Sequence, residues 1–315
     1  MSKIAFIYPG QGAQKAGMGA DFYENSEIAR YIFDQAGEEL DLDMKELCFE
    51  ENDRLDLTEY TQAAMVTTCL AMTRVAESKG LKADITAGLS LGEYPAIAAA
   101  GGMNDMDAIR LVRKRGILMQ NTVPAGEGAM CAVISMAAEE IEKVIEPIAD
   151  VSVANYNCPG QIVITGKTDA VEEAAAKLKE AGARRTIMLN VSGPFHSQML
   201  VPAGEKLAEE LEHTRFHELR IPYVTNVTAE KVTDIRETPG LLTTQISSPV
   251  RWMQSMERMI ADGVDTFVEI GPGRTLEGFL RKINRNVKVF HISQWEDVDK
   301  VCTELADSGK MMEEA

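Results

Sequence analysis

Ser90 lies between two glycines in the sequence GLSLG, residues 88–92, which has the GxSxG spacing found around many serine nucleophiles. Glycines permit a sharp strand-to-helix turn, which exposes the serine hydroxyl near the free N–H groups of a helix N-terminus. Those N–H groups can stabilise an oxyanion during acyl transfer. Serine is also a favoured helix N-cap, so this motif alone is equally compatible with a structural turn.

A serine nucleophile needs a base, and the chain has four histidines to supply one. His213 and His217 lie in polar sequence typical of a surface, so we expect structural roles for both. His291 ends an apolar strand-like run, where we expect a buried residue with satisfied hydrogen bonds. His196 follows a Gly-Pro pair that breaks the preceding strand, which places it at a strand-to-helix junction. His196 is therefore the predicted base.

Composition limits the classes of function that fit this chain. Its 315 residues are 45% hydrophobic, enough for a large core in one domain or in one domain with an insertion. The net charge of −17 disfavours nucleic acid and anionic membrane as partners. Five scattered cysteines and the lack of a signal peptide predict a reducing, cytoplasmic location, and no metal site is expected. No glycine-rich phosphate motif is complete, so we expect no nucleotide cofactor.

The elements that must position Ser90 and His196 follow an α/β pattern. Apolar strand-like runs alternate with helical patterns, which predicts a parallel sheet covered by helices. Between residues 128 and 191 the order becomes strand, helix, strand, strand, helix, strand, which is typical of a ferredoxin-like unit. We therefore predict a larger catalytic domain, residues 1–127 and 192–315, with an inserted subdomain, residues 128–191.

A series of ordered motifs resembles the malonyl-CoA:acyl carrier protein transacylases, an acyltransferase family of fatty acid and polyketide synthesis. The motifs are YPGQGAQ, GLSLGEY, RG at 115–116 followed by MQNTVPAGEGAM, then NYNCPGQIVITG, GPFHS, QISSPVRW and EIGPGRTLEG. The resemblance implies an α/β-hydrolase-like domain with a parallel sheet, carrying a ferredoxin-like subdomain. It also implies transfer of malonyl from malonyl-CoA to the phosphopantetheine thiol of acyl carrier protein, by a ping-pong mechanism through a malonyl-serine ester and without a bound cofactor. The main departure is Leu89, where the family most often has histidine, and it concerns local packing rather than the catalytic base.

The resemblance also implies a role for each matching residue. Ser90 would be the acylated nucleophile, and His196 its general base and then the acid that protonates the leaving thiolate. The backbone N–H groups of Gln11 and Leu91 would form the oxyanion hole. The main-chain carbonyl of Gln245 would hold the histidine where other enzymes use an aspartate, although a glutamine before SSPV could instead cap the next helix.

Arg115 carries the expected substrate preference. In LVRKRG we expect Arg113 and Lys114 on a solvated basic face, whereas Arg115 matches the family's carboxylate-binding arginine. Its rigid guanidinium would hold the free carboxylate of malonate through two parallel charge-assisted hydrogen bonds. In related domains a phenylalanine before the histidine, here Phe195, accompanies unbranched malonyl groups.

Acyl carrier proteins are acidic, as this chain is, so an encounter between them needs a local basic patch. Arg184 and Arg185, beside Lys177 and Lys179, are the predicted docking patch. The alternative is a basic cluster that only complements the C-terminus of a helix.

Two other functions remain open on the same residues. One is a serine hydrolase or thioesterase, which would not require Arg115 in the pocket. The other is a catalytically inactive binding or scaffold subunit of a synthase, which would not require Ser90, His196 and Arg115 together.

Overall fold

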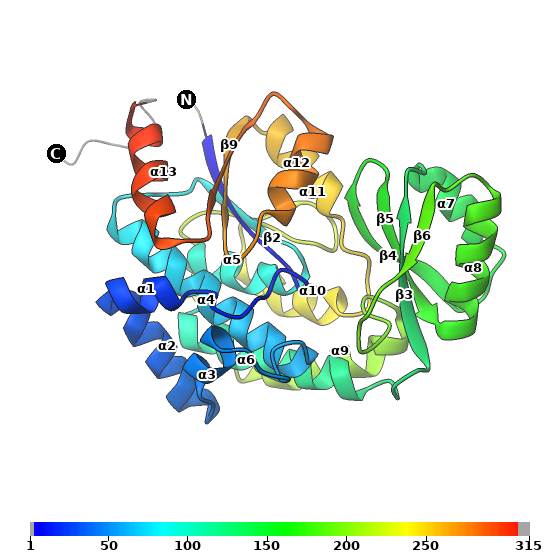
Figure 1. The fold of residues 1–315 in the computed structure, drawn as a ribbon, viewed down its shortest axis with the longest axis horizontal. Coiled ribbons are helices and arrows are strands. Elements are labelled where there is room, and N and C mark those ends of the chain that lie inside the picture. The colour runs from blue at the N-terminus through cyan, green and yellow to red at the C-terminus, as the bar shows by residue number, and fades with distance from the viewer. Residues whose placement is uncertain (1–2, 308–315) are drawn as a thin grey trace.

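A six-stranded sheet forms the centre of the larger part of the molecule (Figure 1). The computed structural model describes residues 3–307; residues 1–2 and 308–315, the two ends of the predicted larger domain, lie outside the described residues. In spatial order the strands are β10 (Lys288–Ile292), β9 (Val264–Ile270), β1 (Lys3–Tyr8), β2 (Ile85–Gly88), β7 (Tyr223–Val224) and β8 (Lys231–Val232). All neighbouring pairs are parallel except β7 and β8. The prediction of a mainly parallel sheet is confirmed.

Helices cover both faces of this sheet, and the alternation of side chains along β1 shows why. Ile4, Phe6 and Tyr8 belong to one apolar cluster, while Ala5 and Ile7 belong to another on the opposite face. The first cluster includes side chains of α2 (Glu27–Leu40), α4 (Thr58–Ser78), α5 (Glu93–Ala99), α6 (Asp105–Asn121) and α9 (Val201–Glu212). The second includes side chains of α11 (Trp252–Ala261) and α12 (Thr275–Ile283).

The remaining helices outside the insertion are short or peripheral. They are α1 (Ala20–Asn25), α3 (Met44–Phe49), α10 (Thr238–Gln245) and α13 (Trp295–Asp307), with single 3₁₀ turns η1 (Ser90–Gly92), η2 (Gln198–Leu200) and η3 (Ile235–Glu237). Within residues 3–307, no helix combines the length and apolar character needed to span a membrane.

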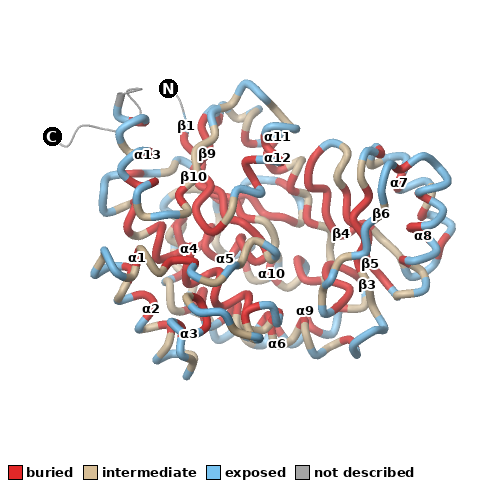
Figure 2. The backbone as a smooth tube through the Cα atoms, viewed as in Figure 1, coloured by how far each residue is buried: buried red, intermediate tan, exposed pale blue. Residues whose placement is uncertain are grey.

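A separate antiparallel sheet lies at one end of the molecule (Figure 1). Its strands, in spatial order, are β4 (Val151–Cys158), β5 (Gln161–Lys167), β3 (Gly128–Ile134) and β6 (Arg185–Met188). Helices α7 (Ala138–Ile145) and α8 (Thr168–Glu180) pack on one face through an apolar cluster of their own. Figure 2 shows β3, β4 and β5 largely buried, whereas the edge strand β6 and the outer sides of α7 and α8 are exposed. The chain order of strands and helices is the one predicted for this stretch.

The opposite face of the antiparallel sheet turns towards the larger part. Met130, Ala132 and Val163 belong to the same apolar cluster as α4 and α6. The main chain also joins the two parts, because Val250 donates its N–H to the Ala154 carbonyl at 2.7 Å and accepts from the Tyr156 N–H at 2.9 Å. The two sheets therefore share a packed boundary, at which a site can form.

Candidate active site

The turn that carries Ser90 depends on both glycines of GLSLG. A Cβ on Gly88 would collide with the main chain of Gly92, and a Cβ on Gly92 would collide with the main chain of Tyr8. Ser90 has φ +54°, a left-handed conformation that non-glycine residues seldom adopt. Leu89, not Ser90, is the N-cap of the turn that follows, and the Ser90 Oγ instead contacts His196 and Arg115. The structure therefore does not support the alternative in which Ser90 serves only as a helix N-cap.

The Asn226 side chain forms two hydrogen bonds to the main chain of this turn. Its Oδ1 accepts the Ser90 N–H at 2.7 Å, and its Nδ2 donates to the Gly88 carbonyl at 2.7 Å. Asn226 lies 136 residues from Ser90 in the chain, and it was not among the predicted site residues. It follows β7, a strand of only two residues that gives no periodic signal in the sequence.

His196 lies within hydrogen-bond distance of Ser90. Its Nε2 is 2.8 Å from the Ser90 Oγ, and its Nδ1 is 2.9 Å from the main-chain oxygen of Gln245. A carbonyl only accepts, so Nδ1 carries the proton and Nε2 is left to accept from the serine hydroxyl. Burial, and then the positive charge of Arg115, lower the pKa of His196 to about 4. The imidazole is therefore neutral at neutral pH, as a general base requires.

Arg115 is fully buried next to these two residues. Its Nη2 donates to the Ser90 Oγ at 3.1 Å and to the Gln245 Oε1 at 3.0 Å, and its Nη1 donates to the Gln62 Oε1 at 2.7 Å. The guanidinium carbon lies 5.6 Å from the centre of the Tyr94 ring. Among the described residues, no carboxylate forms an ion pair with Arg115 and its Nε has no hydrogen-bond partner. A buried cation without a directly paired carboxylate is costly, so this site favours an anionic ligand.

A cavity of about 740 Å³ opens onto these side chains. Ser90, His196 and Arg115 line it, while Gln245 does not. Much of the wall is apolar and comes from both parts of the molecule: Met119, Met130, Val163, Leu189 and Phe195. The cavity thus lies at the boundary of the two sheets, with the polar groups gathered at Ser90.

Gln11 and Leu91, the two predicted oxyanion-hole residues, both line the same cavity. Leu91 lies in the first turn after the nucleophile, where N–H groups have no acceptor within the helix. Gln11 follows β1, and its side chain is held away by a 3.0 Å hydrogen bond from Nε2 to the Thr58 Oγ1. The structure therefore brings the two segments to one site, and their role stays a prediction.

Leu89, the departure from the family motif, serves packing. It lies against the apolar cluster of α11 and α12 and lines the cavity. A Cβ on Gly10 would approach the Leu89 Cδ2 to 2.6 Å, so the glycine at position 10 makes room for the leucine.

Buried polar residues that the sequence analysis did not identify complete the site. Glu93 is fully buried and accepts from the Gln245 Nε2 at 2.6 Å and from the Asn226 N–H at 3.1 Å. Burial raises the pKa of its carboxyl to about 7. A glutamate in the first turn of a helix is ordinarily a favourable charge at the helix dipole, so its sequence position gave no sign of this contact.

The other three histidines do not line the cavity, as expected. His213 is exposed and His217 is partly buried. The expectation for His291 is wrong in detail, because its side chain is only partly buried and its Nε2 has no hydrogen-bond partner among residues 3–307. His291 lies on the edge strand β10, and its Nδ1 is 3.7 Å from the Glu277 carboxylate.

The expectation of a solvated face for both Arg113 and Lys114 is wrong for Arg113. Its side chain is 15% exposed, pairs with the Glu59 carboxylate at 2.9 Å and lies over the Tyr60 ring. The Lys114 side chain is about half exposed and pairs with Glu210 at 3.5 Å. Arg113 therefore joins α6 to α4 and is not available to a ligand in solution.

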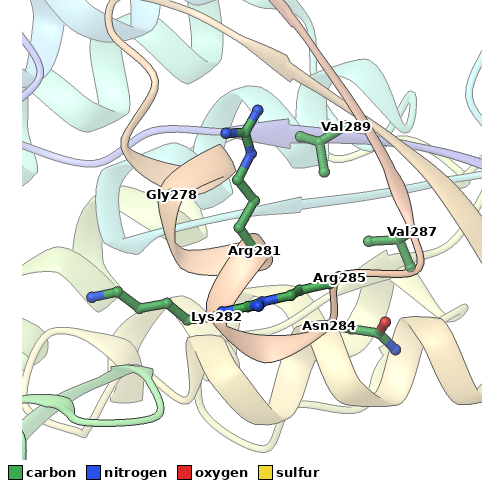
Figure 3. A pocket seen from close by; sticks show the side chains of 7 residues that line it. All are labelled: Gly278, Arg281, Lys282, Asn284, Arg285, Val287 and Val289. Carbon is green, nitrogen blue, oxygen red and sulfur yellow. The ribbon is translucent and has the colours of Figure 1, made fainter.

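A second cavity, of about 580 Å³, lies at the C-terminal end of α12. In Figure 3 the Arg281 side chain points away from those of Lys282 and Arg285, which extend in a similar direction. Arg281 also pairs with Glu277. The predicted site residues do not line this cavity, and its cations do not converge on one point, so the larger cavity is the candidate active site.

Comparisons with known proteins agree with this geometry. The family model for the acyl transferase domain matches residues 5–296. Malonyl CoA-acyl carrier protein transacylase from Bacillus subtilis is 44% identical, over 95% of this chain and 96% of that protein. The crystal structure of malonyl CoA-acyl carrier protein transacylase from Clostridium perfringens has a TM-score of 0.94 and is 42% identical, covering 98% of each chain.

A further solved structure holds a type II PKS acyl-carrier protein in complex with its malonyl-transacylase. It is 36% identical and has a TM-score of 0.93, covering 96% of this chain and all of that one. Together with the match over most of the sequence, these likenesses show that the chain belongs to the family of acyl transferase domains.

Proposed function

We propose that this enzyme transfers the malonyl group from malonyl-CoA to the phosphopantetheine thiol of acyl carrier protein, through a malonyl ester on Ser90, and so supplies extender units for fatty acid synthesis. One observation carries the proposal furthest. The buried guanidinium of Arg115 lies 3.1 Å from the hydroxyl of a serine that is hydrogen-bonded to a neutral histidine. That combination suits an acyl group that ends in a carboxylate.

The chemistry runs in two matched half-reactions. The Ser90 Oγ attacks the thioester carbonyl of malonyl-CoA while the His196 Nε2 accepts the hydroxyl proton. The N–H groups of Gln11 and Leu91 stabilise the oxyanion of the tetrahedral intermediate. When the C–S bond breaks, His196 returns the proton to the CoA thiolate and leaves a malonyl ester. The carrier thiol then attacks this ester, His196 again moving the proton, and Ser90 is released.

Gln245 takes the place of the third member of a catalytic triad. Its carbonyl accepts the His196 Nδ1–H and fixes the tautomer that leaves Nε2 free for the serine. A neutral acceptor makes the histidine a weaker base than a carboxylate would. A thioester has a good leaving group, so the weaker base suffices.

The same residues support a division of the chain. We assign residues 1–127 and 192–315 to an α/β-hydrolase-like domain, a proposal supported by the nucleophile turn directly after β2 of a parallel sheet. We assign residues 128–191 to a ferredoxin-like subdomain. The strand order β4-β5-β3-β6, with both helices on one face, supports this assignment.

Arg184 and Arg185 remain our proposed docking patch for the carrier. Both are exposed, as are Lys177 and Lys179 at the end of α8. Arg185 is the first residue of the edge strand β6. The residues that directly follow this strand, from Leu189 onward, line the cavity. An acidic carrier bound there would have its thiol arm near the cavity mouth. The reducing cytoplasm stays a prediction from the sequence, consistent with five free cysteines, all of which lie in the described part of the chain.

A two-stage assay tests the function against its alternatives. The protein is mixed with malonyl-CoA, and holo-acyl carrier protein is then added. The proposal predicts free CoA in the first stage and malonyl-carrier in the second. Steady release of malonic acid without carrier would identify a hydrolase, and the absence of any reaction in either stage would indicate an inactive scaffold.

A further inference from the structure

A buried chain of hydrogen bonds lies behind the active-site cavity and joins Glu93 to Arg115 through one side chain. Gln245, the last residue of α10, is fully buried between them. Its Nε2 donates to the Glu93 carboxylate at 2.6 Å and to the Ser90 carbonyl at 3.0 Å. Its Oε1 accepts from the Arg115 Nη2 at 3.0 Å, while its main-chain oxygen accepts from His196. Gln245 therefore contacts the nucleophile, the base and the arginine at once.

The two ends of an amide group are not interchangeable in this chain. An ionised carboxylate can only accept hydrogen bonds and a guanidinium can only donate them. The Gln245 amide must then point its NH₂ at Glu93 and its oxygen at Arg115. If the amide turned over, its NH₂ group would face the Arg115 guanidinium and its oxygen would face the Glu93 carboxylate. Neither buried pair could then form a hydrogen bond.

We infer that Glu93 is a positioning residue for malonyl transfer: its carboxylate fixes the Gln245 side-chain amide, which in turn holds Arg115 and the main chain of Ser90 in place. The inference rests on the proposed function, because it concerns the geometry in which Arg115 meets a malonyl carboxylate. Glu93 does not line the cavity, so we infer that it acts through Gln245 and not on the substrate itself.

The surroundings of Glu93 make its effect depend on pH. Burial raises the pKa of its carboxyl to about 7, and this shift is opposed by hydrogen bonds from Gln245, Asn226 and Thr225 and by the charge of Arg115. The other titratable groups that face it are Tyr94, its neighbour on α5, and Tyr223 on β7, whose pKa values are both raised above the ordinary range.

Protonation of Glu93 weakens the hold on the Gln245 amide, since a neutral acid accepts a weaker hydrogen bond than a carboxylate and leaves the Ser90 carbonyl as the main acceptor for the NH₂ group. Malonylation should therefore slow as the pH falls through about 7. His196 stays neutral over that range because its pKa is lowered to about 4.

Single-turnover malonylation of the enzyme, measured from about pH 5 to about pH 9, tests the inference. In the wild type we expect one inflection near pH 7. Glu93→Gln keeps an acceptor for Gln245 but cannot ionise, so the inflection should disappear and the rate should fall only severalfold. Glu93→Ala has no acceptor, and the misplaced arginine should reduce the malonyl rate about tenfold to a hundredfold. The rate with acetyl-CoA, which has no carboxylate to place, should fall less.

Glu269 supplies a matched control. It is another buried glutamate whose pKa burial raises to about 7, but it accepts from the N–H groups of Leu276 and Glu277 at the start of α12 and does not contact Gln245. Glu269→Gln should therefore retain the inflection near pH 7.

A wild-type profile without an inflection near pH 7 would overturn the inference, and that result does not depend on any variant folding. So would an inflection that survives in Glu93→Gln, or an equal loss of malonyl and acetyl rates in Glu93→Ala. A wild type that forms no malonyl adduct at all would instead contradict the proposed function, so the two failures are distinguishable.

Discussion

Arg115 is a fully buried cation whose three hydrogen bonds go to uncharged oxygens. Removing the partner of a buried carboxylate costs roughly 3–5 kcal/mol, and each 1.4 kcal/mol changes a rate about tenfold. Arg115→Ala should therefore lower kcat/KM for malonyl-CoA by about 10²–10³-fold. Acetyl-CoA leaves no carboxylate unpaired, so its slow transfer should hold steady or rise.

Steady-state kinetics with both thioesters check this prediction, and Arg115→Lys is the conservative comparison. Lysine keeps the charge but not the planar fork, so it should restore only part of the malonyl activity. If the alanine variant loses malonyl and acetyl transfer by the same factor, Arg115 supports the structure of the site and does not select the substrate.

His196 supplies the base that the Ser90 hydroxyl needs. A positioned general base contributes about 10²–10⁴-fold, so His196→Ala should slow acylation at neutral pH by that factor. His291→Ala is the matched control, because His291 does not line the cavity. Rapid-quench acylation by malonyl-CoA gives both rates, and a near-normal rate in His196→Ala would remove this histidine from the mechanism.

At the scale of elements, the turn between β2 and η1 sets the position of Ser90. The main chain of Gly92 occupies the space that a Cβ on Gly88 would need, so Gly88→Ala must displace the turn. We expect a lower melting temperature and a loss of acylation larger than the loss of stability alone explains.

Gly278→Ala is the control for this turn, because a Cβ there would meet nothing within 4 Å. It lies inside α12, where alanine is favoured over glycine by about 1 kcal/mol, so its melting temperature should not fall. Acylation by Gly88→Ala at the wild-type rate would show that the glycine is not needed to place the serine.

The sequence predicted the elements that carry a local signal. β1, β2, β9 and β10 are apolar runs, and the GLSLG turn is specified by its own residues. The two-residue strands β7 and β8 carry no such periodicity.

The sequence also did not identify three polar site residues, Asn226, Gln62 and Glu93, because the partners that define their roles lie far away along the chain. Asn226 is 136 residues from Ser90, and Gln62 is 53 residues from Arg115. Their roles exist only once tertiary packing brings these segments together, whereas a motif records neighbours along the chain. The cavity wall depends in the same way on the main-chain contacts between Val250 and β4.

At the scale of the whole molecule, the net charge of −17 opposes the approach of an acidic carrier. Reversing both Arg184 and Arg185 to glutamate should weaken transfer to the carrier and leave self-acylation by malonyl-CoA unchanged. The effect should grow weaker at high salt, because exposed charges are screened.

The control for this reversal carries the same change in net charge elsewhere. Arg236 and Lys300 are exposed and do not line the cavity, so their double reversal to glutamate should affect transfer less. The rates of self-acylation and of transfer to the carrier are measured separately for both double variants. An equal loss in both half-reactions for the Arg184 and Arg185 variant would count against docking at this patch.

The central claim is a malonyl ester on Ser90, and the intact mass of the protein after incubation with malonyl-CoA tests it most directly. The account predicts that the wild type gains the mass of one malonyl group, that peptide mapping places it on Ser90, and that added holo-carrier removes it. Ser90→Ala should gain nothing while its stability stays within about 1 kcal/mol of the wild type, since the change removes only one partly buried hydroxyl. A malonyl adduct of equal amount on Ser90→Ala would contradict the account.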